Sequence, residues 1–280
     1  MPVKPFLTIE QQVDHLHAAG MQIDDRAAAE AILADTNYYR LINAYALDLY
    51  ADEGKTVFVP GISFGDVYGL YAFDCKLRHI ISEMLEEFEI IFRTKLAYYI
   101  GEKYGPLGYL NPEMYSGNQY FMEMLSSMQR EKEVQCKSPI VKHHDDCYGG
   151  DIPIWAIVEI LPFGATSKMF KNMLPEDKAA VSRSLGVHQY VYLESWLRSF
   201  TEVRNACAHY GRLYNKQLLF PPRLPKGCDF PPNRIFAVLY LLRPFTKSQT
   251  YVSATLRLNE ALKQYPSIDR NKIGFPANYA

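Results

Sequence analysis

The sequence predicts an all-α fold, and two of its features carry that prediction. Apolar residues recur every three to four positions over most of the chain, as in amphipathic helices, and the alternation typical of half-buried strands does not recur. Hydrophobic residues make up 48% and charged residues 22% of the 280 positions, which is typical of a globular protein with a substantial core. We therefore expect a helical bundle.

The first 60 residues predict a small N-terminal helical lobe. In "LTIEQQVDHLHAAG", Thr8 and Gln11 occupy capping-box positions and Gly20 marks the helix end. "DDRAAAEAILADT" consists of strong helix formers, and "NYYRLINAYALDLY" continues with an aromatic-rich face. Because the turn-rich stretch "ADEGKTVFVPG" follows, we place a boundary there, between a lobe at 1–60 and a larger helical domain at 61–280.

The longest periodic segment begins at Val67 and predicts a long helix. One face follows alternating steps of three and four: Leu70, Asp74, Leu77, Ile81, Met84, Phe88 and Ile91. Asp74 is its only polar member. We favour a position at a bent or exposed end, since carboxylates are mostly exposed unless they are paired. The alternative is a buried carboxylate paired with a base such as Arg78.

Two stretches in the middle of the chain are interpreted as loops. Residues 101–117 are rich in glycine, proline and asparagine, which disfavours a helix. Residues 136–152 are interpreted as a mobile polar loop. Its potential ligands do not have the spacing of a zinc knuckle, so we expect neither a metal site nor a cofactor. These ligands are Cys136, His143, His144 and Cys147.

The second half of the chain returns to the helical pattern. "IPIWAIVEILPFGATSKMF" is periodic, and "PEDKAAVSRSLG" has the proline start and glycine end typical of a helix. "HQYVYLESWLRSFTEVRNACAH" predicts a helix of about six turns. After the proline-rich connector "PPRLPKGCDFPPNR", two further helical patterns complete the chain.

The charge, the cysteines and the absence of long apolar runs indicate where in the cell the protein is expected. A formal net charge of -1 provides no general basic field, so nucleic-acid binding would require a local patch. Five cysteines without a repeated spacing suggest reduced thiols in a cytoplasm. The start of the chain shows no signal peptide, and "IFAVLYLL" is too short to span a bilayer. We expect a soluble cytoplasmic protein without a membrane partner.

Three polar residues mark the end of the six-turn helix, in "RNACAHYGRLYN". Asn205 and His209 are four positions apart and lie one above the other, whereas Arg204 and His209 are separated by about 140°. The arginine side chain is long enough to reach across that angle. We also expect the helix to end at Gly211, which would leave His209 accessible. The three side chains are therefore predicted to converge on one small anion.

This residue set suits metal-independent cleavage of an RNA phosphodiester. Histidine exchanges protons near neutral pH, so His209 is predicted to take the proton of a 2′-hydroxyl or protonate the leaving oxygen. Arg204 would stabilise the charge on phosphate in the transition state. Asn205 would fix the imidazole tautomer or hold the phosphate. One imidazole cannot easily serve both sides of the phosphorus, so we expect a homodimer with a composite site.

The residues around this motif form a candidate RNA surface. Seven basic residues occur between 198 and 234 against two acids, Glu202 and Asp229, and Tyr210 and Tyr214 are interleaved for stacking on bases. The basic residues are Arg198, Arg204, Arg212, Lys216, Arg223, Lys226 and Arg234. Arg212 and Lys216 are the strongest candidates because they flank the motif. A solvated basic loop with tyrosines in the core is the alternative.

Three charged residues interrupt apolar patterns elsewhere, namely Arg40, Arg93 and Glu159. We favour a structural role in buried ion pairs or hydrogen-bond networks, because buried charges are normally paired. The alternative is a supporting position beside the catalytic groove.

The motif resembles a known family. "RNACAHYGRLYN" is similar to the Arg-Asn-x-x-x-His motif of HEPN ribonucleases, and specifically to the motif of Abi-like (AbiD/AbiF-type) abortive-infection proteins. Four further segments resemble that family in the same order, so the likeness spans approximately residues 4–220. They are "LTIEQQVDHLHAAGMQIDD", "TNYYRLINAY", "VYGLYAFDCKLRHIISEMLEEFEIIFRTKLAYYI" and "PIWAIVEILPFGATSKMF". The resemblance implies a HEPN-like helical bundle, usually dimeric, that cuts RNA without a metal and shuts down a phage-infected cell.

By motif match, Arg204 and His209 carry over as catalytic, with Asn205 beside them. Tyr210 stands where a second histidine is frequent in the family. A toxin of this kind requires a restraint, for which a protein antitoxin, a small RNA or a conformational latch would serve. The alternatives are a non-catalytic HEPN-type module that binds RNA or protein, a metal-dependent hydrolase that uses the residues of the 136–152 loop, and a core role for His209.

Overall fold

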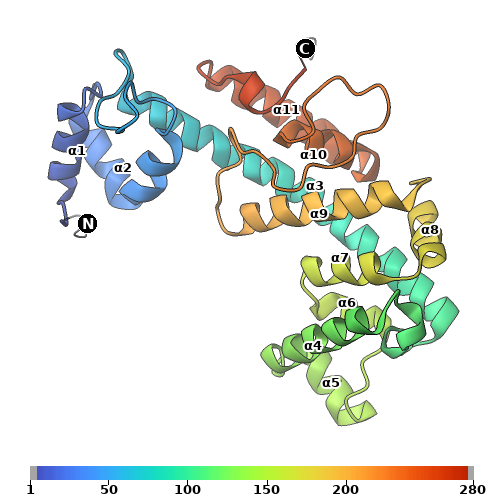
Figure 1. Cartoon of the computed structure of the whole chain (residues 1–280). Coiled ribbons are helices and arrows are strands. Elements are labelled where there is room, and N and C mark those ends of the chain that lie inside the picture. The colour runs from blue at the N-terminus through green and yellow to red at the C-terminus, as the bar shows by residue number, and fades with distance from the viewer. Residues whose placement is uncertain (1–4, 277–280) are drawn as a thin grey trace.

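One long helix organises the whole molecule. The computed structural model describes residues 5–276; the first four residues, on which the signal-peptide expectation partly rests, lie outside them, as do the last four. Helix α3 (Phe64–Tyr104) crosses the molecule from end to end, and most of the later helices pack along it (Figure 1). Within residues 5–276 the chain forms helices and isolated bridges but no strand, so the all-α prediction is confirmed.

Local sequence signals set both ends of α3. Ser63 caps its N-terminus, because the Ser63 hydroxyl accepts from the Asp66 N–H and the Asp66 carboxylate accepts from the Ser63 N–H. Gly105, with φ at 82°, follows its last turn. The segment 101–117 is predicted to be non-helical, but its first four residues belong to α3. The rest of the segment lies outside this helix.

The N-terminal helices gather at one end of α3, shown in blue in Figure 1. They are α1 (Ile9–Ala18), with the predicted Thr8–Gln11 capping box, and α2 (Arg26–Asp35). The third predicted helix is instead a short π-helical turn, Tyr39–Asn43, that packs on α3. Such turns often occur at functional sites. The division into domains at residue 60 stays a prediction.

Four shorter helices follow α3 in the chain, and the last two of them pack on it. They are α4 (Asn118–Val134), α5 (Pro139–Tyr148), α6 (Ile154–Ile160) and α7 (Phe163–Asn172). Helix α5 contradicts the predicted mobile loop at 136–152. Its boundary signals are clear in retrospect: Ser138 accepts from the Val141 N–H, Pro139 occupies the first turn, and Gly149 at φ 61° ends it.

The last third of the chain returns along α3. Helix α8 (Pro175–Ser184) leads into α9 (Tyr190–Ala208), which packs on α3, α7 and α8. An extended connector then reaches α10 (Ile235–Leu242) and α11 (Ser248–Gln264), both of which contact α3. These helices agree with the sequence prediction. Thus α3 and α9, which carry the residues singled out above, lie side by side (Figure 1).

Aromatic side chains dominate the core where these helices meet. Phe88 on α3 contacts Phe200 of α9 at a centroid distance of 4.8 Å, and Phe92 lies 6.2 Å from Phe163. Arg93 is buried among them, as predicted, where it pairs with Glu89 and donates to the Leu161 carbonyl at 2.8 Å. The buried guanidinium therefore has partners on two elements.

None of the helices within residues 5–276 is both long and apolar enough to cross a bilayer. All five cysteines have free thiols in this structure.

Candidate active site

The end of α9 is fixed by a Schellman motif. The Gly211 N–H donates to the Ala206 carbonyl at 2.7 Å, and the Tyr210 N–H donates to the Cys207 carbonyl at 3.1 Å. The left-handed residue of this motif is Tyr210, at φ 56°, rather than the expected Gly211. A non-glycine residue in that conformation stores strain on the order of 1 kcal/mol. The chain thus places a strained tyrosine directly after His209.

We expect Tyr210→Gly to be more stable than Tyr210→Ala by roughly 1 kcal/mol, because only glycine relieves the strain at positive φ. Both variants lose the ring, so the comparison isolates the backbone. Urea unfolding of the two proteins measures the difference. Equal midpoints and slopes would show that the backbone at Tyr210 is not strained.

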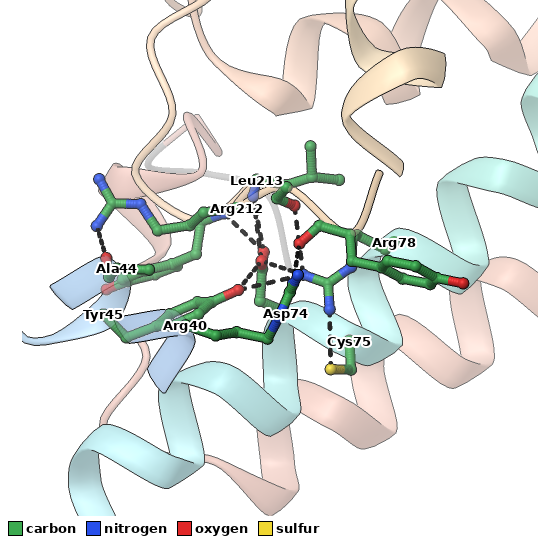
Figure 2. Close-up of polar contacts among 11 residues, drawn as sticks. Arg40, Ala44, Tyr45, Asp74, Cys75, Arg78, Arg212 and Leu213 are labelled. Carbon is green, nitrogen blue, oxygen red and sulfur yellow. Dashed lines mark hydrogen bonds and ion pairs between the residues drawn. The ribbon is translucent and has the colours of Figure 1, made fainter. Parts of the chain in front are cut away.

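The segment that follows is anchored to a buried carboxylate, Asp74 of α3 (Figure 2). Asp74 accepts from the N–H groups of Leu213 and Tyr214, the latter at 2.7 Å. The Tyr45 hydroxyl donates to it at 2.6 Å, as does Arg78, also at 2.6 Å. The expectation of an exposed Asp74 is therefore wrong, and the alternative of a buried pair with Arg78 is confirmed.

Burial controls the electrostatics of this cluster. Burial raises the pKa of the Asp74 carboxyl group, while the Tyr45 hydrogen bond and the Arg78 charge act to lower it. Burial likewise raises the pKa of the Tyr45 hydroxyl. Arg78 also donates to the Gly211 carbonyl at 3.4 Å and to Cys75 Sγ at 2.9 Å. The cluster thus holds the backbone from Gly211 to Tyr214 against α3.

The N-terminal lobe holds the same segment from the other side. Arg40, in the π-helical turn, donates to the Tyr210 carbonyl at 2.9 Å and lies 5.8 Å from the centre of its ring. Arg212 donates to the Ala44 carbonyl, as Figure 2 shows. The prediction that Arg40 is buried is wrong, since it is exposed. Its contact nevertheless places it beside His209.

The three residues of the motif occupy two sides of α9. Asn205 and His209 are exposed, one turn apart on the same face. Arg204 turns towards α3, where its Nε lies 3.4 Å from Glu89 Oε2. Within residues 5–276, no hydrogen bond or ion pair joins the three side chains, and the His209 ring has no hydrogen-bond partner. Their convergence on one anion stays a prediction.

Glu89 is a residue of the site that sequence reasoning missed. It lies on α3, its side chain is 13% exposed, and it pairs with both Arg93 and Arg204. A carboxylate four residues before an arginine on a helix is a recognisable pair, but its contact with α9 depends on tertiary packing. Glu89 thus gives Arg204 an ion-pair partner on α3, while the Arg204 side chain remains 42% exposed.

Several residues of the candidate RNA surface have other partners. Tyr214 is buried, so the expectation that it stacks on RNA bases is wrong; the Asp74 anchor pulls this segment into the core. Lys216 forms an ion pair with Glu202 at 2.9 Å, and Arg212 donates a hydrogen bond to the Ala44 carbonyl. Tyr210, 67% exposed, and Arg198 remain available.

The remaining candidates lie apart from this site. Glu159 on α6 is exposed rather than buried, and it lies beside Trp155 and Tyr98. In the 136–152 segment, His143 and Cys147 approach to 3.8 Å, but residues 5–276 contain no group of three or more side chains arranged to hold a metal.

Comparison with known families places this site within one of them. The model of the family described as Abi-like protein matches residues 31–215, which is more than half of the chain. The matched region begins in α2 and ends at Asn215, so it includes the π-helical turn, Asp74, Glu89 and the end of α9. Comparisons with curated proteins and with solved structures found no match.

Proposed function

The chain belongs to the Abi-like protein family, and from this membership and the end of α9 we propose that it is a HEPN-type ribonuclease toxin of abortive infection. The family suggests a role in abortive infection. The ribonuclease activity, the HEPN assignment and the AbiD/AbiF subtype are part of the proposal. We further propose that the protein acts in the cytoplasm and cleaves RNA without a metal.

The observation that supports the proposal most strongly is the exposed histidine at a rigidly held helix end. Three elements fix the backbone after His209: the Schellman motif, the Asp74 cluster and Arg40. The imidazole itself has no hydrogen-bond partner within residues 5–276. A histidine with a purely structural role in the core would be expected to lie buried and hydrogen-bonded. A rigid support around a free acid–base group is the arrangement that catalysis requires.

In the proposed reaction, His209 removes the proton of the ribose 2′-hydroxyl, and the oxygen attacks the adjacent phosphorus. The bond to the 5′-oxygen breaks, that oxygen takes up a proton, and a 2′,3′-cyclic phosphate remains. Arg204 stabilises the charge on the phosphate oxygens. Because one imidazole serves one side of the phosphorus, we propose that a second copy of the chain supplies the acid.

The partners of the proposed toxin are RNA, a second copy of the chain and an antitoxin. A ribonuclease that acts on the host cell's own RNA has to be restrained before infection. A small RNA or a protein that covers the end of α9 would serve this purpose.

The test is cleavage of end-labelled RNA by purified protein in excess chelator, over a range of protein concentrations. We expect cleavage to persist, to leave 2′,3′-cyclic phosphate ends, and to rise more steeply than linearly with concentration if the site is composite. Cleavage that the chelator abolishes would contradict the metal-independent reaction. Folded protein that binds RNA without cutting it would favour the non-catalytic module.

A further inference from the structure

An open groove of about 880 Å³ runs along α9 and ends at Asn205. Its base is the exposed face of α9, from Val191 to Asn205, a length of about 21 Å at 1.5 Å per residue. Helix α7 forms one wall, and the extended segment at 219–223 forms the other. His209 lies one turn beyond Asn205 on the same helical face. The groove therefore leads towards the proposed catalytic residue.

Four cations line this groove without a carboxylate partner within residues 5–276: Lys168, Lys171, Arg198 and Arg223. Both acids of the groove are already neutralised. Glu194 pairs with Lys178 at 3.1 Å, and Glu202 pairs with Lys216 at 2.9 Å. The local field is thus strongly positive, although the net charge of the chain is -1. A groove with this field attracts a polyanion.

Side chains of α9 hold the wall that the extended segment at 219–223 forms. The Glu202 carboxylate accepts from the N–H groups of Leu219 and Phe220, at 3.2 and 3.1 Å. Further along, the Trp196 indole donates to the Arg223 carbonyl at 2.7 Å. Two side chains of α9, about two turns apart, therefore fix this wall. A site formed before its ligand arrives loses less entropy on binding.

The groove also offers stacking surfaces. The Arg198 guanidinium lies 3.5 Å from the centre of the Phe220 ring, and both side chains are exposed. Leu219 beside them is 76% exposed. Unpaired bases stack on aromatic rings and on guanidinium planes, whereas duplex RNA keeps its bases stacked inside the helix. An acidic peptide would be attracted by the cations but would not use the stacking surface.

We propose that this groove, between α7 and the segment at 219–223, binds single-stranded RNA and guides it to His209. Lys168, Lys171 and Arg223 contact phosphates, and the Arg198–Phe220 pair stacks on bases. This inference rests on the proposed function for the identity of the ligand. The groove proposal adds α7 to the residues that contact RNA. This helix belongs neither to the motif at the end of α9 nor to the candidate RNA surface at 198–234.

Binding is measured with His209→Ala protein, so that cleavage does not interfere, by fluorescence anisotropy of a labelled unstructured RNA of 12 nucleotides. We expect the added pair Lys168→Ala and Lys171→Ala to weaken binding on the order of tenfold. It should also reduce the slope of log affinity against log salt by about 1.4, at 0.7 for each lost contact to a single strand. The matched control is Lys137→Ala with Lys263→Ala, since both lysines are exposed and neither lines the groove.

Phe220→Ala tests the stacking surface separately. Loss of a stacked base is expected to weaken binding roughly fivefold to a hundredfold while leaving the salt slope unchanged. A duplex of the same length should bind more weakly than the single strand. Equal affinity for the duplex, or a polyglutamate peptide that binds the groove in place of RNA, would overturn the proposal.

The two proposals fail in different ways. If the lysine pair binds RNA like its control while the wild type cleaves RNA, the groove proposal is wrong and the proposed function stands. If RNA binding depends on the groove but the wild type never cleaves RNA, the groove proposal stands and the ribonuclease proposal is wrong.

Discussion

His209→Ala is expected to slow RNA cleavage by roughly 10²–10⁴-fold, the usual contribution of a positioned general acid or base. The same substitution should leave the free energy of unfolding nearly unchanged. His209 is exposed, its ring has no hydrogen-bond partner within residues 5–276, and its backbone bonds do not depend on the side chain. Loss of activity with retained stability is the signature that separates a catalytic histidine from a structural one.

The matched control is His188→Ala, an exposed histidine just before the start of α9. It should cleave RNA like the wild type. Initial rates with excess chelator and urea unfolding of both variants provide the two measurements. A His209→Ala protein that cleaves at the wild-type rate would show that the chemistry lies elsewhere.

Arg204 provides a second check on the same step. If Arg204 and His209 act on one transition state, the double alanine variant should be little slower than the worse single variant. If the rate loss of the double variant equals the product of the two single losses, the two residues have independent roles. Glu89 complicates the single Arg204→Ala change, because its carboxylate then keeps only Arg93 as a partner. The unfolding free energy of that variant should be measured beside its rate.

The helices were predictable because their signals are local. The capping box at Thr8, the proline and glycine that bracket α8, and the period of α3 all lie within one helix. Helix α5 was missed for a different reason: its polar composition hid the Ser138–Pro139 start and the Gly149 end. Composition therefore misled where capping residues would have been the better guide.

The site was predictable only in part, because most of it is tertiary. Sequence spacing places Asn205 and His209 on one face of α9, but it cannot show that Arg204 turns to Glu89 on α3. Nor does it show that Arg40 donates to the carbonyl of Tyr210, which is 170 positions away in the chain. The sequence predicted that Tyr214 stacks on bases, because nothing local shows that it is buried. Its burial depends on a contact with Asp74, which is far away in the chain. Phe220, the exposed aromatic residue of the groove, went unnoticed for the same reason.

Asp74→Ala is expected to destabilise the protein by roughly 3–5 kcal/mol, the cost of leaving a buried charge without its partner. The loss has two sources. Arg78 keeps its charge in a buried position, and the N–H groups of Leu213 and Tyr214 lose their acceptor. RNA cleavage should fall as well, because the segment that follows His209 is released. Urea unfolding followed by circular dichroism measures the change.

Two further variants separate the sources of that cost. Tyr45→Phe removes one donor and should cost about 1 kcal/mol, whereas a change at the exposed Asp14–Arg26 pair should have little effect. Removing Arg78 together with Asp74 relieves the unpaired charge but not the two N–H groups, so the double variant should recover only part of the loss. Full recovery would mean that the charge pair alone matters and that Asp74 does not anchor the segment after His209. Partial recovery would support the central role of this carboxylate, which is to join α3 and the end of α9 into one rigid site.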